Sequence, residues 1–449
     1  MSLLDAVPPG WTLRDVQRDA LQQIEACWAD TDVLVVRAPV GAGKSLVART
    51  LARWVGRATI CTPTNALVAQ YQASFPDLPT IPLGAGCGSQ AAWTVAEAPA
   101  KVLNYWSYLA HRVYEPVVVF DEAHRLVPTL QDMEAVTVWT HLVPIPAWVT
   151  TAPDLLVWAE GNRGAEGTTG RVAAGLYRKL RQDPATWEVV AGVGEYRGHS
   201  RSYIRVVPLT PRLNRPVLWP PKRVRKLVFV SATFHHEDLV DLGLDGRRVR
   251  VVDVGSPIAA ADRPIVFCPT ANPSRGPGYE AAVREIAGGV ARLLDRHPER
   301  GLIHTTYAMA QRLRQHLGDH PRLMWHSPDT RAAQYQAWLR DPTPGLCLVG
   351  SGMTEGIDLP GDLCRWQVVT KVEWPDLGAS AVAAKQAQRP DWYAWAAARS
   401  VQQAVGRSSR GPGDYSVTYI LDSSFGRLYT DNRSMFAGSF QAALRYGVL

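Results

Sequence analysis

One segment near the N-terminus constrains the fold more than any other part of the chain. An apolar run, Val33 to Val36, leads into Ala38-Pro39-Val40-Gly41-Ala42-Gly43-Lys44-Ser45, and an apolar stripe at helical spacing follows from Leu46 to Val55. The glycines let the backbone curl so that its N–H groups face one point, and the helix N-terminus adds partial positive charge there. This strand–loop–helix unit predicts a phosphate-binding loop at the edge of a parallel sheet.

The residues of this loop are expected to bind a nucleoside triphosphate together with magnesium. The backbone of Gly41, Ala42 and Gly43 would surround the phosphates, Lys44 would reach the β- and γ-phosphates, and Ser45 would ligate Mg²⁺. The alternative is a glycine-rich turn that ends in Lys-Ser by chance, and the flanking strand and helix argue against it. ATP and Mg²⁺ are therefore the expected cofactors.

Short apolar runs recur along the chain, and each is followed by a turn and a helical pattern. They include Val117–Phe120, Leu227–Val230, Leu346–Val349 and Val417–Ile420. Strands that are apolar without alternation are buried on both faces, which predicts parallel sheets covered by helices. The expected fold class is α/β, and the length of 449 residues allows two or three domains.

Two segments interrupt this pattern. The region after residue 126 has helical signals and a glycine-rich stretch, and Trp187–Ala191 and Tyr203–Val207 could pair as a hairpin around the polar tip Gly192–Ser202. The segment Gly255–Arg263 contains Pro257 and is interpreted as a linker. The predicted division is a first lobe at 1–125 and 191–258, a small, mostly helical insertion at 126–190, and a second lobe at 259–449.

A pair of acidic residues follows the run Val117–Phe120. Asp121-Glu122-Ala123-His124 begins where that strand is expected to end, at the nucleotide-binding edge of a parallel sheet. Asp121 would hold Mg²⁺ directly or through water, and Glu122 would polarise an attacking water as general base. A surface pair of acids is the alternative, which the buried strand and the upstream phosphate loop disfavour.

Further short motifs occur in an order typical of one enzyme group. They are Arg14 and Gln17; Thr62-Pro63-Thr64 with Leu67 and Gln70; Asn104-Tyr105; Ser231-Ala232-Thr233; Glu355-Gly356-Ile357-Asp358-Leu359-Pro360-Gly361-Asp362; and Gln403-Ala404-Val405-Gly406-Arg407-Ser408-Ser409-Arg410 with Asp414-Tyr415. Their order resembles that of superfamily 2 helicases of the XPD/DinG-like group. The resemblance extends from about residue 11 to about residue 425 and is thinnest over 126–215.

This resemblance implies two tandem RecA-like lobes with ATP bound between them. Arg14 and Gln17 would contact the adenine, and Asp358 would lie near the ribose. Gln403 would position the water or the γ-phosphate. Arg407 and Arg410 would act as arginine fingers that stabilise the negative charge of the transition state from the second lobe.

The resemblance also implies a nucleic-acid path across both lobes. Its candidate residues are Thr62, Thr64, Asn104, Tyr105, Thr305, Thr306 and Tyr307. Trp106 and Tyr108 could stack on bases or be buried. The expected partner is single-stranded or forked DNA, and no loading protein is indicated. The expected activity is ATP-dependent unwinding with 5′ to 3′ movement, in repair, replication or recombination; the alternatives are an RNA helicase or an ATP-gated DNA-binding or assembly subunit.

Composition supports these expectations without deciding them. A net charge of +7 suits a polyanionic partner. The six cysteines contain no C-x-x-C pair, and the segment from Gln70 to Val117 is too short for the four-cysteine domain that relatives often carry there, so no iron–sulfur cluster is expected. No signal peptide and no membrane-spanning run is apparent, and a cytoplasmic monomer with a reduced arch-like insertion is expected.

Overall fold

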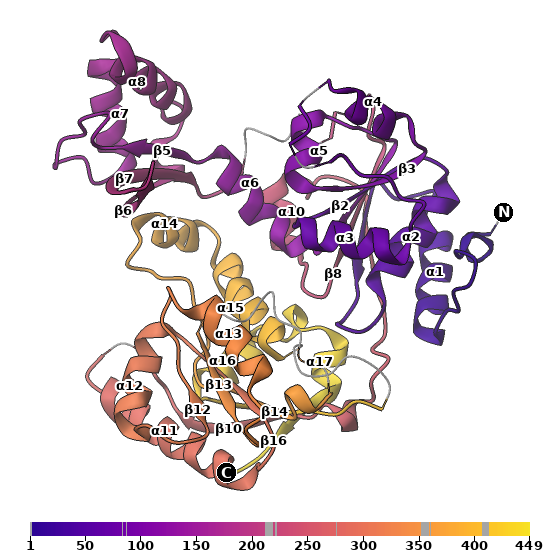
Figure 1. The fold of residues 1–449 in the computed structure, drawn as a ribbon, viewed down its shortest axis with the longest axis vertical. Helices are drawn as coiled ribbons and strands as arrows, with labels where there is room; N and C mark the ends of the chain where they lie inside the picture. The colour runs from indigo at the N-terminus through magenta and orange to yellow at the C-terminus, as the bar shows by residue number, and fades with distance from the viewer. Residues whose placement is uncertain are drawn as a thin grey trace.

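The chain forms two lobes and a smaller projecting insertion, seen in a computed structural model (Figure 1). The structure describes residues 2–82, 84–86, 88–211, 219–220, 222–274, 276–351, 359, 361–405 and 413–449. In Figure 1 the first lobe lies at the upper right, the insertion at the upper left and the second lobe below.

The first lobe is built on a six-stranded parallel sheet in the order β3-β2-β4-β8-β1-β9. Its strands are β1 (Val33–Arg37), β2 (Ala58–Thr62), β3 (Ala100–Asn104), β4 (Val117–Asp121), β8 (Lys226–Ser231) and β9 (Val249–Asp253). Its helices are η1 (Leu3–Ala6), α1 (Asp15–Cys27), α2 (Lys44–Val55), α3 (Asn65–Ser74), α4 (Gln90–Glu97), α5 (Tyr105–His111), η2 (Ala123–Arg125), α6 (Leu126–Glu134) and α10 (His236–Leu242).

Alternate residues of the central strands enter two different hydrophobic cores. In β1, Leu34 and Val36 pack on one face of the sheet, whereas Val33 and Val35 pack on the other. Each core is closed by helices, so the strands need apolar residues at every position. This explains why apolar and polar residues do not alternate in these strands, and it confirms the predicted parallel sheet covered by helices.

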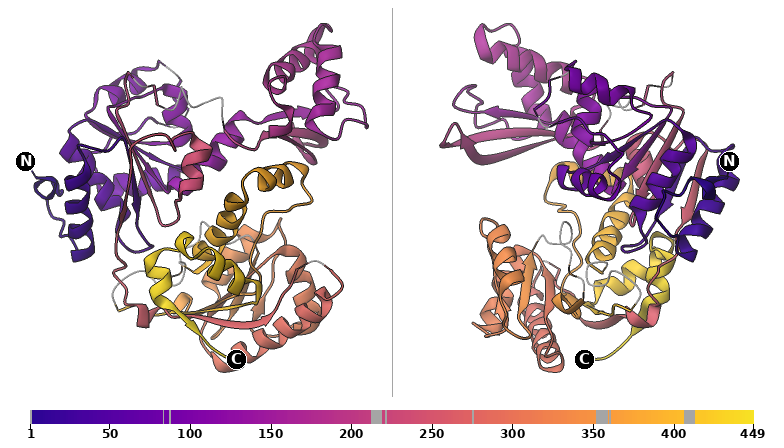
Figure 2. Two further views of the ribbon diagram at one scale, coloured as in Figure 1. Left: turned by 180° about the vertical axis from the view of Figure 1, so that it is seen from behind. Right: turned by 45° about the vertical axis from the view of Figure 1, so that its right-hand side comes forward.

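The insertion leaves the first lobe after α6 and returns to it before β8. It contains β5 (Val136–Trp139), α7 (Ala152–Asn162), α8 (Gly167–Leu180), η3 (Pro184–Thr186), β6 (Trp187–Tyr196) and β7 (His199–Pro208). Its three strands form an antiparallel sheet in the order β5-β7-β6. In Figures 1 and 2, α7 and α8 lie together on one side of this sheet.

The expected hairpin is present, but it differs from the prediction in length and in the part of the fold to which it belongs. Its strands continue through Gly192–Ser202 and turn only at Arg197 and Gly198, which both have left-handed backbone with φ of 51° and 80°. The hairpin pairs with β5 and not with the sheet of the first lobe. The insertion therefore contains a sheet as well as helices, and this sheet extends to Pro208.

The second lobe has a seven-stranded parallel sheet in the order β12-β13-β11-β14-β15-β10-β16. Its strands are β10 (Ile265–Ala271), β11 (Gly301–Thr305), β12 (Leu323–Met324), β13 (Cys347–Ser351), β14 (Trp366–Val369), β15 (Val417–Asp422) and β16 (Leu444–Tyr446). Its helices are η4 (Ala260–Asp262), α11 (Tyr279–Arg296), α12 (Tyr307–Leu317), α13 (Arg331–Arg340), η5 (Gly361–Leu363), α14 (Ser380–Gln388), α15 (Pro390–Val405), α16 (Ser424–Asp431), η6 (Arg433–Met435) and α17 (Gly438–Ala443).

The connection between the lobes includes the predicted linker. It runs from the end of β9 at Asp253 to the start of β10 at Ile265, and Figure 2 shows this single strand of chain passing from one lobe to the other. The helices α14 and α15 of the second lobe reach back toward the first lobe and the insertion (Figure 2). None of the helices in the described part of the chain has the length and apolar character needed to cross a lipid bilayer.

Candidate active site

The predicted phosphate loop lies between β1 and α2. Gly41 and Gly43 have left-handed backbone, with φ of 80° and 77°, and α2 begins at Lys44 directly afterwards. A Cβ atom on Gly43 would lie 2.1 Å from Nε2 of Gln17. The backbone conformation therefore favours glycine at this position, and a side chain there would displace the Gln17 amide.

The side chains of Arg14 and Gln17 donate hydrogen bonds to the backbone of the phosphate loop. Nε2 of Gln17 donates a hydrogen bond to the carbonyl of Ala42 at 2.9 Å, and the guanidinium of Arg14 donates to the carbonyl of Gly41. The other end of the buried Gln17 amide accepts from the backbone N–H of Arg14 at 2.9 Å, which also caps the start of α1. These two residues thus set the shape of the loop, whereas the adenine contact expected of them stays a prediction.

Lys44 and Glu122 face each other at the carboxyl ends of β1 and β4. Nζ of Lys44 lies 3.3 Å from Oε1 of Glu122, in an ion pair that is mostly shielded from solvent. Glu122 has left-handed backbone with φ of 50°, which is uncommon for a residue with a side chain. Strained backbone of this kind occurs at functional sites, where the surrounding structure holds it in place.

Asp121 lies beneath this pair and is almost completely buried. Its carboxylate accepts hydrogen bonds from the Tyr71 hydroxyl at 2.9 Å and from the Glu122 backbone N–H at 2.9 Å. Burial and the negative charge of Glu122 together raise its pKa to about 6, and Lys44 acts in the opposite direction.

The oxygen atoms in and around the Asp121 carboxylate fit a magnesium ion. Mg²⁺ prefers oxygen ligands and keeps several waters alongside one or two protein groups and phosphate oxygens. The carboxylate of Asp121 and the hydroxyl of Ser45, both near the Tyr71 hydroxyl, are such ligands. Tyr71 itself gave no signal in the sequence, because a tyrosine on a helix face usually indicates only burial.

A chain of polar contacts leads from Glu122 to the second lobe. Nδ1 of His124 lies 3.5 Å from Oε2 of Glu122 and 2.9 Å from Oγ of Ser231. The Ser231 hydroxyl accepts from the backbone N–H of Thr233 at 3.2 Å. Nε2 of Gln403, in α15, then donates to Oγ1 of Thr233 at 3.2 Å. The site thus has a direct connection across the lobe boundary.

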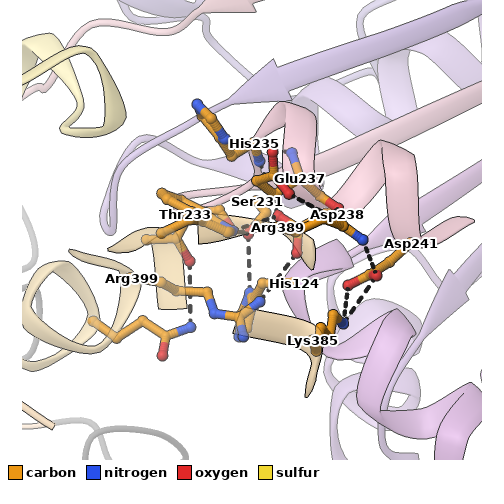
Figure 3. A network of polar contacts seen from close by, with 12 residues as sticks. His124, Ser231, Thr233, His235, Glu237, Asp238, Asp241, Lys385, Arg389 and Arg399 are labelled. Carbon is orange, nitrogen blue, oxygen red and sulfur yellow. Dashed lines mark hydrogen bonds and ion pairs between the residues drawn. The ribbon is translucent and has the colours of Figure 1, made fainter. Parts of the chain in front are cut away.

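A second set of polar contacts joins the two lobes, beside the contacts that run from Glu122 to Gln403 (Figure 3). The acidic residues come from α10, which follows Thr233, and the basic residues come from α14, α15 and the turn between them. Asp241 accepts from Lys385 at 3.0 Å and from Arg389 at 2.7 Å. We call the six residues Glu237, Asp238, Asp241, Lys385, Arg389 and Arg399 the interlobe network.

The pKa values in this region reflect its burial. Burial raises the pKa of Asp238 to about 6, and the charge of Arg399, 3.1 Å away, offsets part of this effect. The carboxylate of Asp238 also accepts from the indole N–H of Trp395 at 3.1 Å. The His235 ring stacks on Trp395 at 4.8 Å, and burial lowers the pKa of this histidine to about 4.

Comparison with known proteins agrees with this two-lobe geometry. Residues 290–442, most of the second lobe, match the helicase C-terminal domain family. A solved apo XPD structure superposes with a TM-score of 0.63 at 13% identity, covering 96% of this chain and 100% of that chain. Xpd4 of S. tokodaii gives 0.62 at 13% identity, covering 97% and 100%. Residues 290–442 therefore belong to the helicase C-terminal domain family, and the chain as a whole has the fold of the XPD structures.

Each lobe is therefore RecA-like, as expected. A further structure named as an XPD helicase gives a TM-score of 0.62 at 13% identity, covering 98% of this chain and all of the other. No curated protein matches the chain by sequence. At this level of identity the structural likeness concerns the fold, so the roles of individual residues rest on the geometry of this chain.

Several residues expected on a nucleic-acid path lie at the carboxyl ends of strands in the first lobe. Thr64 caps α3 and Asn104 caps α5, and the Asn104 amide also donates to the side chain of Asn65. Thr62 is buried, and its hydroxyl donates to the Thr64 carbonyl at 3.1 Å. Tyr105 is fully buried, and its hydroxyl donates to the Asp121 carbonyl at 2.6 Å, so its side chain is not available to a strand in this structure.

The corresponding residues of the second lobe follow β11. Thr306 caps α12, and the ring of Tyr307 packs edge-on against His326 at 5.6 Å. Thr305 is buried at the end of the strand. Trp106 is 50% exposed beside Asn104, whereas Tyr108 is buried. Of the two residues that could stack on bases, only Trp106 therefore has an accessible side chain.

Three expected site residues, Asp358, Arg407 and Arg410, lie outside the described residues, so their roles stay predictions. Gln403 is described and lies near the end of α15. The expectation that the chain lacks an iron–sulfur cluster also stays a prediction.

Proposed function

We propose that this chain is a helicase that hydrolyses ATP between its lobes and moves 5′ to 3′ along single-stranded DNA, unwinding duplexes in repair, replication or recombination. The observation that carries the proposal is the chain of contacts from Lys44 through Glu122, His124 and Thr233 to Gln403. A hydrolytic site that is joined to the other lobe by hydrogen bonds can transmit the state of the nucleotide to the position of that lobe. The 5′ to 3′ direction is supported by the family resemblance.

The proposed roles follow from chemistry and position. Lys44 and the backbone of the phosphate loop bind the phosphates, and Glu122 orients the attacking water and accepts its proton. Ser45 and Asp121 would hold Mg²⁺, which neutralises phosphate charge when bound. Arg407 and Arg410 are proposed as arginine fingers, which are worth about 10³–10⁵ in rate where they occur.

The first test measures ATP turnover with and without single-stranded DNA. Lys44→Ala and Glu122→Gln should each lower turnover by at least about 10²-fold while the fold is retained, because general-base catalysis alone contributes about 10²–10⁴. The exposed residues Lys222 and Glu97 supply matched controls, Lys222→Ala and Glu97→Gln, which should turn over normally. Wild-type turnover in either site variant would show that the site is wrongly assigned.

The second test separates the proposed activity from its alternatives. Forked duplexes of DNA and of RNA are offered with either a 5′ or a 3′ tail. We expect ATP-dependent unwinding of DNA that has a 5′ tail. Unwinding of RNA alone would favour an RNA helicase, and unwinding from a 3′ tail would reverse the proposed direction. ATP-dependent binding without unwinding would favour a clamp or an assembly subunit.

A further inference from the structure

The three-stranded sheet of the insertion has two chemically different faces. Val138, Ile204 and Val206 point to the face that packs against α7 and α8 and belong to the core of the insertion. Because side chains alternate along a strand, Trp139, Tyr203 and Arg205 point to the opposite face. That core does not include Trp139 or Tyr203.

Aromatic rings gather on this opposite face. The Trp139 ring lies 5.4 Å from that of Tyr203 and 5.1 Å from that of Tyr196, and the His141 ring lies 4.9 Å from that of Tyr196. None of these four side chains is fully buried. The second lobe approaches this sheet through α14, which contacts η3 and β6. The cluster is therefore a large aromatic area that contributes little to the core.

Two glycines make room for these rings. Gly192 lies directly opposite Tyr203 in the hairpin, and a Cβ atom there would lie 2.7 Å from the tyrosine ring. A Cβ atom on Gly194 would lie 3.1 Å from the same ring and 3.4 Å from that of Trp139. The Tyr203 ring thus lies directly over the hairpin backbone, in space that side chains at Gly192 and Gly194 would fill.

Arginines surround the rings. Arg201 pairs with Gly194 on the same face and is exposed, and Arg197, at the turn, lies with its guanidinium 5.5 Å from the centre of the Tyr196 ring. Arg205 is paired with Asp132 at 2.9 Å. Arg197 and Arg201 are thus exposed cations on the hairpin that carries Tyr196 and Tyr203, and the hairpin register also puts the acidic Glu188 on this face. We call Trp139, Tyr196, Tyr203, Arg197 and Arg201 the aromatic face.

We propose that the aromatic face binds single-stranded nucleic acid. Bases stack on half-exposed aromatic rings whatever their sequence, and sheets that present such rings beside cations are a known solution for binding unpaired bases. Arg197 and Arg201 would contact the phosphates between stacked bases. The occupant is a single strand because a duplex keeps its bases stacked inside and offers no free face to these rings.

This inference rests on the proposed function only for the identity of the motor's substrate, and its test needs no ATP. The 449-residue chain is titrated with a fluorescent single-stranded DNA or RNA oligonucleotide, without nucleotide, over a range of salt concentrations. Arg197→Ala with Arg201→Ala should weaken binding and lower the salt slope by about 1.4, since each phosphate contact on a single strand contributes about 0.7. Tyr203→Ala should weaken binding about 5- to 150-fold for the loss of one stacked base.

Matched controls lie on α8, on the other side of the same insertion. Arg171→Ala with Arg178→Ala removes the same charge from exposed positions and should leave the salt slope unchanged. Oligonucleotides that carry 5-iodouracil supply a second measurement, because this base crosslinks to stacked aromatic side chains. Crosslinks to peptides that contain Trp139, Tyr196 or Tyr203 are expected.

The possible results separate this inference from the proposed function. Equal salt slopes for the two arginine pairs, with crosslinks confined to the lobes, would overturn the aromatic face even if DNA stimulates ATP turnover normally. Crosslinks at the aromatic face without any stimulation of turnover would support the face and contradict the motor. Preference for the DNA or the RNA oligonucleotide identifies the natural strand.

Discussion

The substitution Asp241→Asn tests whether the interlobe network holds the two lobes together. The Asp241 side chain is 3% exposed and contacts both Lys385, which is 6% exposed, and Arg389. Asparagine has nearly the same shape but carries no charge. The substitution would therefore leave the buried Lys385 without the charge of its carboxylate partner, while Arg389 keeps its pair with Glu237.

The size of the effect follows from this burial. Removing one partner of a buried ion pair costs about 3–5 kcal/mol, whereas an exposed pair is worth about 0–1 kcal/mol. Burial already lowers the pKa of Lys385, and Asp241 offsets this effect, so the pKa falls further in the variant and part of the cost is relieved by deprotonation. We therefore expect a loss of about 3 kcal/mol, equivalent to about a hundredfold change in the equilibrium between joined and separated lobes.

Hydrogen–deuterium exchange measures this loss locally, which matters because a two-lobed chain need not unfold in one step. Faster exchange is expected in α10 and α15. The control Asp431→Asn breaks the exposed pair between Arg427 and Asp431, whose side chains are 91% and 56% exposed, and should change little. A double-mutant cycle with Lys385→Met should give a coupling energy above about 0.5 kcal/mol. The reasoning is refuted if Asp241→Asn costs no more than Asp431→Asn.

Three further predictions concern the nucleotide site. Gly43→Ala should abolish binding of a fluorescent ATP analogue, because the added Cβ would collide with Gln17; Gly56→Ala has the same φ of 77° with nothing within 4 Å and should bind normally. In the absence of bound metal the Asp121 pKa is about 6. The Mg²⁺ affinity measured by calorimetry should therefore fall as the pH drops through 6, and the fall should approach about tenfold per pH unit. An affinity that stays constant from pH 7 to pH 5 would contradict this. Tyr71→Phe removes a hydrogen bond to the Asp121 carboxylate, which should raise that pKa and move the same profile to higher pH; an unmoved profile would exclude this role.

The sheets and the phosphate loop could be predicted because their signals are local. A strand buried on both faces needs consecutive apolar residues, and the loop needs glycine where φ is positive, so β1, β4 and Gly43 are visible in the sequence alone. The hairpin tip was placed wrongly for a related reason. Gly192 and Gly194 resemble turn residues, but they are small because the Tyr203 ring lies over them.

Contacts between distant segments could not be predicted. Nothing near Asp241 indicates that it meets Lys385, because the pair depends on how α10 and α14 approach one another in the fold. Gln17 illustrates the same limit at shorter range. Its position in a recognisable motif indicated the nucleotide, but its hydrogen bonds to the phosphate loop depend on the packing of α1 against that loop.

Both connections between the lobes converge on α15, and this bears on how the site could control movement. Trp395 contacts Asp238 near the start of the helix, and Gln403 contacts Thr233 near its end. These residues are separated by about 12 Å of continuous helix, at about 1.5 Å per residue.

Because a helix moves as a rigid unit, a shift of Thr233 that follows changes at Glu122 and His124 would be transmitted to both contacts at once. Weakening the interlobe network should therefore slow ATP turnover without touching the nucleotide site, and Asp241→Asn with normal turnover but loosened lobes would show that the two connections act separately.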